Sequence, residues 1–332
     1  MSMDWDVLGT IRRGVTVSEW NLGVADLALD DLVDGAAAPG AAPKVVRPHV
    51  RWFYKPWFVC YQADPCLVED GGRLYLYYED VLFGSMKGRL RAGRFDPPGS
   101  GRPRRARPGA PMIDLGHHAA YPYVFKHESA FYCVPDTGED GFVILFRSES
   151  PLGPWQRRST LFERLPARDS TIFQYQDRWW LFANVCEPGD GSCENADLHI
   201  YHGPEPWGPW TAHAANPAKR DVCSARPAGR PFLVDGALYR PAQDCGPRYG
   251  SRVAINRVTA LTPSTFAEEV CAYLEPDPGG RYPAGLHTLT SAGGCVVIDG
   301  QFEGFSPNPF KTVATAWAKA VHKFRPPKGA SR

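Results

Sequence analysis

Five residues whose side chains could take part in chemistry recur at similar intervals along the chain. They are Asp64, Tyr121, Asp169, Arg226 and His287, which lie 57, 48, 57 and 61 positions apart. Each stands before an apolar run, a polar turn and an aromatic or β-branched run, as in ADPCLVEDGGRLYLYYED at residues 63–80. Two carboxylates that face one site can supply acid–base catalysis, and an arginine can bind an anionic group. The spacing therefore suggests one site assembled from segments that are distant in sequence.

The segments that carry these residues have the pattern of β-hairpins. Between hairpins lies a second unit of two short strands, such as FVILFRSESPLGPWQRRSTLF at 142–162, so each repeat supplies about four strands. The turns PLGPW and PWGPW, 55 positions apart, follow the same frame. We therefore predict an all-β fold, a single five-bladed β-propeller with four-stranded blades over residues 1–325, followed by a disordered tail at 326–332.

Two consequences follow from a propeller. The innermost strands of the blades converge at one mouth of the central channel, so the five leading residues are expected to surround a funnel-shaped central site. The last blade must also be closed, because an open ring would expose strand edges. We expect residues 3–12 or 310–324 to complete it by strand pairing between the two ends of the chain.

The hairpins resemble those of five-bladed glycoside hydrolases of families 43, 32 and 62. They are more similar to the propeller module that precedes the transferase domain in glucosamine inositolphosphorylceramide transferases and bacterial relatives. The similarity spans roughly residues 50–300 and rests on YPYVFKHESAFYCVPDT, DSTIFQYQDRWWLF, PLGPW, ARPAG, YG and, most specifically, RPAQDC. The resemblance implies that Asp64 corresponds to the general base of the hydrolases. It implies that Asp169 corresponds to their carboxylate that positions the sugar and tunes the pKa of the acid.

One position departs from the hydrolase pattern. Where the resemblance implies a glutamate acting as general acid, the fourth hairpin has Arg226. An arginine does not release its proton at neutral pH, so it cannot be that acid. A displaced acid is expected instead at Asp244, in the specific RPAQDC motif, or at Asp136 in VPDTGED. Asp244 is the preferred catalytic candidate, with the alternative that it is a structural carboxylate paired with Arg240.

Seven residues are predicted to bind the substrate. Both tyrosines among them could stack on sugar rings or pack in the core, and the arginines could bind an anionic or N-substituted group. The histidine could be a hydrogen-bonded core residue. We predict neither a metal site nor a cofactor, although by resemblance to family 43 a cation could lie beside this histidine in the channel. The seven are Tyr121, Asp136, Arg226, Arg240, Gln243, Tyr249 and His287.

The charge balance narrows the class of partner. With 37 Lys and Arg against 36 Asp and Glu, the chain lacks the basic excess typical of nucleic-acid or membrane-surface binding. A saccharide or another small molecule is the expected partner. The first residues lack a signal-peptide pattern, so a cytoplasmic location is expected, and the nine cysteines are expected to be mostly buried thiols.

Three functional hypotheses fit these observations. The first is a carbohydrate-active, glycosidase-like enzyme with Asp64, Asp169 and Asp244 as its carboxylate set. The second is a saccharide-binding module that has lost the acid. The third is a biosynthetic tailoring enzyme, such as a cyclase, lyase or transferase, on the same scaffold.

Overall fold

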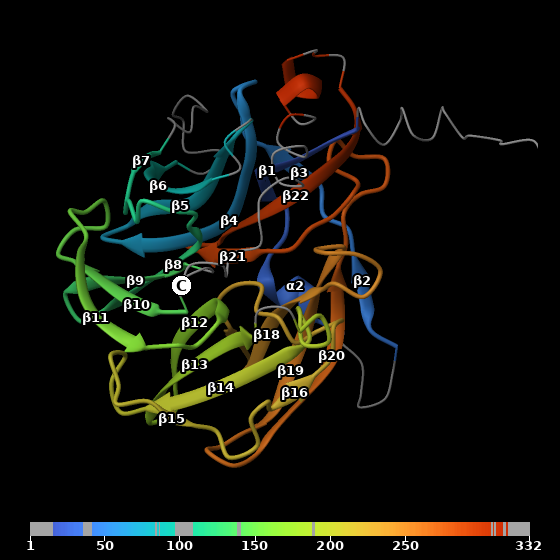
Figure 1. Ribbon diagram of the computed structural model, residues 1–332. Coiled ribbons are helices and arrows are strands. Elements are labelled where there is room, and N and C mark those ends of the chain that lie inside the picture. Colours follow the sequence, from blue (N-terminus) through green and yellow to red (C-terminus); the bar gives the residue numbers. More distant parts are fainter. Residues whose placement is uncertain are drawn as a thin grey trace, which may run out of the picture.

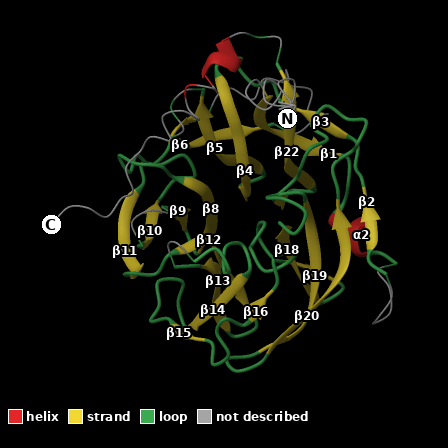
Figure 2. Cartoon of the chain, turned by 45° about the vertical axis from the view of Figure 1, so that its right-hand side comes forward, coloured by secondary structure: helices red, strands yellow, loops and turns green. Residues whose placement is uncertain are grey.

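The fold is almost entirely β, as predicted. The computed structural model describes residues 16–35, 42–83, 85, 87–96, 109–137, 141–187, 190–306, 308, 310–314 and 317. Helix α2 (Leu29–Val33) is short, and the strands form four sheets arranged around a common centre (Figures 1 and 2). None of the helices in these ranges is long and apolar enough to cross a membrane.

The largest sheet has eight strands and contains both described ends of the sheet-forming chain. Its order is β21 (Leu289–Ala292), β22 (Cys295–Phe305), β1 (Thr16–Ala25), β4 (Val59–Asp70), β5 (Arg73–Leu82), β6 (Gly88–Phe95) and β7 (Ala110–Pro111), with β3 (Val50–Trp52) paired to β1. It consists of two antiparallel groups, because β1 meets β4 only through the parallel pair Trp20 and Tyr61.

The other sheets are smaller. One runs β11 (Gln156–Phe162), β10 (Val143–Ser148), β9 (Ala130–Asp136) and β8 (Ala120–His127). The next runs β12 (Ala167–Tyr175), β13 (Arg178–Val185), β14 (Asp197–Gly203) and β15 (Thr211–Ala212), with β16 (Lys219–Arg220) on β14. The fourth runs β17 (Phe232–Val234), β18 (Ala237–Asp244), β19 (Arg252–Leu261), β20 (Phe266–Leu274) and β2 (Lys44–Val46). The short strands β16 and β2 bring these last two sheets to five strands.

The first and last described strands pair with each other. Strand β1 pairs antiparallel with β22 along its whole length, from Thr16 opposite Phe305 to Ala25 opposite Val296. Residues 3–12 lie outside the described residues, and residues 310–314 are helical rather than extended. The prediction for residues 3–12 therefore stays a prediction, whereas residues 310–314 do not form the predicted strand.

Neighbouring sheets pack face to face through their apolar side chains. One cluster joins the sheet of β8–β11 to that of β12–β16 and includes Phe125, Leu145, Ile172 and Leu181. Burial of a side chain of this size contributes about 1.5–3 kcal/mol. These contacts fix the inner strands relative to one another, and with them the polar residues that the strands carry.

Three inner strands share an unusual backbone feature. The registers of β4, β8 and β12 each shift where the strand passes Asp64, Tyr121 and Asp169. Those residues have φ values of 54°, 43° and 51°. A left-handed conformation at a residue other than glycine costs about 1–3 kcal/mol and is concentrated at functional sites. The three leading residues predicted from the repeat are thus equivalent in backbone geometry.

Most of the cysteines are buried thiols, as expected, and one pair is the exception. Cys186 and Cys193 are joined by a disulfide bond rather than being thiols. The two cysteines are seven residues apart in sequence. Both lie in the connection between β13 and β14, where the chain brings their sulfur atoms together. The other seven cysteines are free, and six of these are buried, as predicted.

Candidate functional site

The carboxylate of Asp64 is the hub of a buried hydrogen-bond network. One of its oxygens accepts a hydrogen bond from Thr288 Oγ1 at 3.1 Å and lies 3.3 Å from His287 Nε2. The other accepts from the backbone N–H of Tyr121 at 3.3 Å. The left-handed backbone at Asp64 turns the side chain out of the strand's regular alternation, which allows it to reach three other segments. Asp64 therefore links the first, second and fifth hairpins of the sequence repeat.

Asp299 completes this network and was not predicted from sequence. Its Oδ1 accepts the backbone N–H groups of His287 and Thr288 at 2.9 and 3.0 Å. Its Oδ2 lies 2.7 Å from His287 Nδ1 and accepts the backbone N–H of Asp64 at 3.2 Å. The one sequence signal for this role is that the aspartate follows directly on the apolar run of VVIDGQ, in a strand where it is buried.

His287 lies between two carboxylates. Burial opposes its protonation, but the charges of Asp299 and Asp64 outweigh it and raise its pKa above the ordinary value. The imidazolium can then direct one N–H toward each carboxylate. The ligand atoms of Asp64, His287 and Asp299 also lie within 4.8 Å of one another, close enough to hold a metal ion. A metal would require His287 to be neutral, so metal binding and the raised pKa oppose each other.

Asp169 anchors the other half of the site. Its Oδ2 accepts hydrogen bonds from Arg226 Nε at 2.6 Å and from Gln243 Nε2 at 2.7 Å. Arg226 also donates to Asn195 Oδ1 at 2.6 Å, and its guanidinium carbon lies 5.2 Å from the Tyr249 ring centre. Arg226 is thus fixed over the site by an ion pair, in the position where the hydrolase pattern has a carboxyl group.

Glu79 is a further carboxyl group that sequence reasoning missed. It lies on β5 opposite Ala63, the residue before Asp64, and the two carboxyl groups repel each other when both are charged. Burial, and then the charge of Asp64, raise the pKa of Glu79 well above the ordinary value. Burial also raises the pKa of Asp64, against the opposing charge of His287. Burial and mutual repulsion thus favour the protonated form of one carboxyl group in this pair. The register of β4 against β5 was the signal that could have found Glu79.

Asp136 has the properties of a group that titrates near neutral pH. It ends β9, opposite Ala120, and is 6% exposed. Burial and then the charge of Asp169 raise its pKa to about 6. Its Oδ1 is buried, has no hydrogen-bond partner among the described residues and lies 3.7 Å from Arg168 Nη1. A buried carboxyl oxygen without a hydrogen-bond partner is uncommon, and it marks Asp136 as a candidate functional group.

Asp244 and Arg240 lie in separate ion pairs. The alternative prediction, in which Asp244 is paired with Arg240, is therefore wrong about the partner. Asp244 binds Arg252 at 2.7 Å and accepts the N–H of Gly246 at 3.0 Å. Arg240 is 1% exposed and binds Glu268. Arg240 and Asp244 lie on the same face of β18 but four residues apart, so each reaches its own partner, whereas Gln243 lies on the opposite face and points to Asp169. Of the two candidates for the acid, Asp136 has the raised pKa and the unpartnered oxygen, whereas Asp244 and Arg240 are each held in an ion pair.

The two predicted tyrosines differ in exposure. Tyr121 is 3% exposed, and its hydroxyl is hydrogen-bonded to Thr171 Oγ1 at 2.9 Å. Tyr249 is 44% exposed and packs with its ring edge against His287, at 5.4 Å between ring centres. Trp20, which was not predicted, packs on the same histidine at 4.1 Å. Of the two tyrosines, Tyr249 is the one placed to stack on a ligand.

Comparison with known sequences gives a consistent result. The family described as Glucosamine inositolphosphorylceramide transferase 1, N-terminal, matches residues 31–282. A protein named glucosamine inositolphosphorylceramide transferase 1 from Oryza sativa subsp. japonica is 32% identical over 255 residues, covering 72% of this chain and 33% of the relative. The protein of the same name from Arabidopsis thaliana is 32% identical over 223 residues, covering 66% of this chain and 28% of the relative. The chain thus spans about a third of the length of the curated relatives it matches.

Solved structures show the fold. A family 117 glycoside hydrolase from Zobellia galactanivorans matches with a TM-score of 0.51 and 10% identity, over 87% of this chain and 91% of that chain. A structure from the GH130 family of mannoside phosphorylases, reported to contain hydrolases that target β-1,2 mannosidic linkages in Candida mannan, matches with a TM-score of 0.51 and 11% identity, over 75% of this chain and 85% of that chain. These likenesses establish an all-β fold of the propeller glycoside hydrolase type. Together with the match over residues 31–282 and the identity to the plant proteins, they show that the chain belongs to the family described as Glucosamine inositolphosphorylceramide transferase 1, N-terminal.

Proposed function

We propose that this chain is a carbohydrate-active, glycosidase-like protein that acts on a glycosidic bond at the site of Asp64, Asp136 and Asp169. The observation that carries the proposal is Asp136, a buried carboxyl group with a pKa of about 6 and an oxygen without a hydrogen-bond partner among the described residues. A general acid works best when its pKa lies near the working pH. The fold likeness to glycoside hydrolases and the family's name support a carbohydrate-related role.

In the proposed reaction the three carboxyl groups have different tasks. Asp136 protonates the leaving oxygen, and Asp64 accepts the proton of the attacking water or acceptor hydroxyl. Asp169 contributes to the raised pKa of both groups, so it lies near each of them, and it holds Arg226 in place. Burial and the charge of Asp64 favour the protonated form of Glu79, which leaves Asp64 as the group of this pair that accepts a proton. Because of its exposure, Tyr249 is assigned to the sugar ring.

We also propose that the ring has five blades around a funnel. In this interpretation the eight-stranded sheet counts as two blades, because its antiparallel halves meet at only one residue pair. Contacts of Asp64 with Tyr121 and His287, and of Asp169 with Arg226, join the leading residues of all five repeats. Convergence of this kind is expected at the mouth of a propeller channel.

A second candidate is a saccharide-binding module without turnover. It is favoured by Arg226, which occupies the place of the expected acid and is held there by Asp169. Isothermal titration calorimetry with oligosaccharides and glycosylated metabolites, followed by product analysis of the same mixtures, separates the two candidates. Turnover of any bound glycoside, by hydrolysis or by transfer to an added acceptor, supports the enzyme. Binding of several glycosides with no product in any mixture supports the module.

The pH dependence of turnover tests the role of Asp136. As the acid it must be protonated, so we expect kcat to fall as the pH rises through about 6. In Asp136→Asn, kcat should fall by roughly 10²–10⁴ for glycosides with poor leaving groups and much less for aryl glycosides with good ones. In this variant the fall of kcat at alkaline pH should disappear from the pH profile.

A matched variant makes this result specific. Asp177→Asn makes the same substitution at an exposed carboxylate in a turn and should leave the profile unchanged. An alkaline limb that persists in Asp136→Asn, or an equal effect on good and poor leaving groups, contradicts the assignment of Asp136.

A further inference from the structure

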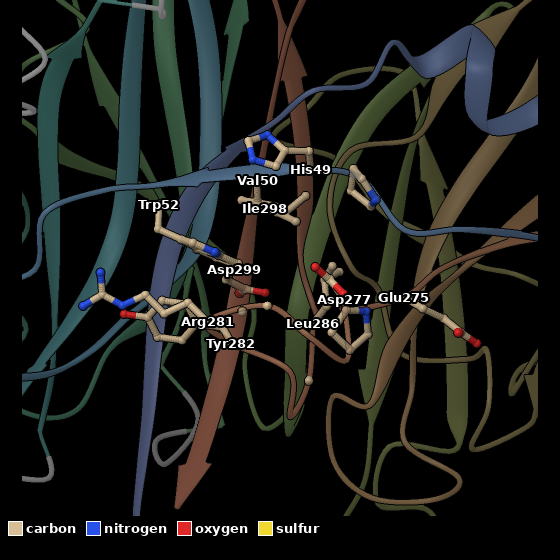
Figure 3. Close-up of a pocket in the computed structure, with 15 residues that line it drawn as sticks. His49, Val50, Trp52, Glu275, Asp277, Arg281, Tyr282, Leu286, Ile298 and Asp299 are labelled. Atoms are coloured by element: carbon tan, nitrogen blue, oxygen red, sulfur yellow. The ribbon is translucent and has the colours of Figure 1, made fainter. Parts of the chain in front are cut away.

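A cavity of about 240 Å³ lies on the flank of the molecule, between strand β3, strand β22 and the loop that follows β20 (Figure 3). Its floor is apolar and includes Val50, Leu286 and Ile298. Leu286 and Ile298 are each 1% exposed, so the floor belongs to the rigid core. A pocket with an apolar floor and a few polar groups at its rim is typical of small-molecule sites.

Trp52 forms one wall of the cavity and is held firmly in place. Its ring centre lies 4.5 Å from that of Tyr282. It packs against two glycines, because a Cβ atom at Gly23 would lie 2.8 Å from the indole and one at Gly300 would overlap it. The chain thus keeps two positions on adjacent strands free of side chains where the indole lies. A fixed aromatic surface beside a cavity suits a ring-shaped ligand.

The charged groups at the rim nearly balance. Figure 3 shows Arg281 beside Trp52 and Tyr282 on one side, with Glu275 and Asp277 on the other. Glu275 is neutralised by ion pairs with two arginines, one of them Arg252 at 2.7 Å. An anion would meet Asp277 and a cation would meet Arg281, whereas hydroxyl groups can bind to both.

From these features we infer that the cavity binds a single neutral monosaccharide. Its volume of about 240 Å³ has room for one hydroxylated ring. Arg281 would donate to ring hydroxyls, Asp277 would accept from them, and Trp52 would contact the ring. Asp299 also lines the cavity, but its carboxylate oxygens already bind His287, Thr288 and Asp64. Asp299 is therefore not counted among the groups that bind the sugar. For this reason the inference does not depend on the function proposed for the candidate site.

Methyl NMR of the whole chain tests this inference. The methyl groups of Val50, Leu286 and Ile298 report on the cavity, and the γ-methyl of Thr171 reports on the candidate site. Titration with methyl glucoside, methyl galactoside and methyl mannoside should shift the three cavity methyls with a Kd on the order of 1–10 mM for at least one sugar. Glucosamine and glucuronate, which carry a charge, should bind roughly tenfold more weakly.

Variants separate this site from the candidate site. The exposed changes Arg281→Ala and Asp277→Ala should each weaken the sugar-induced shifts roughly tenfold. Arg248→Ala, which removes an exposed arginine outside the cavity, and Asp64→Asn should leave them unchanged. The inference is overturned if no neutral sugar shifts the cavity methyls at about 50 mM, well above the expected Kd. It is also overturned if charged sugars bind as well as neutral ones, or if both rim variants bind like the unmodified chain.

Discussion

Replacing Asp64 by asparagine should lower turnover of a glycoside substrate by roughly 10²–10⁴ and leave the fold intact. The single oxygen of asparagine can still accept the N–H of Tyr121, and its amide N–H can donate to the Thr288 hydroxyl, but asparagine cannot take a proton from water. It also tolerates the left-handed backbone that position 64 requires. The measurement is kcat on whichever glycoside or acceptor pair the unmodified chain turns over, with binding followed by calorimetry.

The control for this prediction lies on the same strand. Asp70→Asn makes the same change at the far end of β4, where the carboxylate is paired with Lys126 on the surface. Its turnover should match that of the unmodified chain. Equal turnover in Asp64→Asn would remove Asp64 from the proposed reaction. Loss of sugar binding as well as turnover in Asp64→Asn would favour a binding role instead.

The leading residues of the repeat could be predicted because their signal is local. Each precedes an apolar run in its own hairpin, so an alignment of hairpins finds them without any knowledge of the fold. The structure gives Asp64, Tyr121 and Asp169 a common left-handed conformation and a common break in strand register. The sequence did not predict that conformation, because glycine, the residue that usually marks it, is absent at all three positions.

The groups that complete the site could not be found in the same way. Glu79 reaches Asp64 only through the register of β4 against β5, which shifts at Ala63. Asp299 reaches His287 through the pairing of β21 with β22 and the bend before it. Both contacts depend on which residues stand opposite each other, and a change of register by one residue would turn the side chain to the other face of the sheet. A repeat alignment does not contain that information.

The choice between Asp244 and Asp136 shows that a specific sequence motif does not by itself identify a catalytic residue. RPAQDC is the more specific motif, and specificity of sequence favoured Asp244. A motif can be specific because it builds a scaffold, and here it supplies Arg240 to Glu268, Gln243 to Asp169 and Asp244 to Arg252. Asp136 lies in an unremarkable stretch, and its raised pKa arises from burial and from Asp169, a residue on another sheet.

The ion pair between Arg240 and Glu268 should be among the most sensitive points for stability. Both side chains are 1% exposed, and Glu268 also binds Lys219 at 2.8 Å. Burial disfavours the charged form of Glu268, but Arg240 and Lys219 outweigh it and lower its pKa below the ordinary value. Glu268→Gln leaves the buried Arg240 without its countercharge, which typically costs about 3–5 kcal/mol. Urea unfolding at pH 7 measures the loss.

The surface pair Arg248–Glu303 is the matched comparison, since both partners are largely exposed. Glu303→Gln should change the free energy of unfolding by about 1 kcal/mol or less. The contribution of the Glu268 carboxylate should itself be lost as the pH falls through its lowered pKa, because protonation removes the charge that holds Arg240. If Glu268→Gln costs no more than Glu303→Gln, the buried pair does not stabilise the fold. Arg240 would then have to be reconsidered as the substrate-binding residue that the RPAQDC motif first suggested.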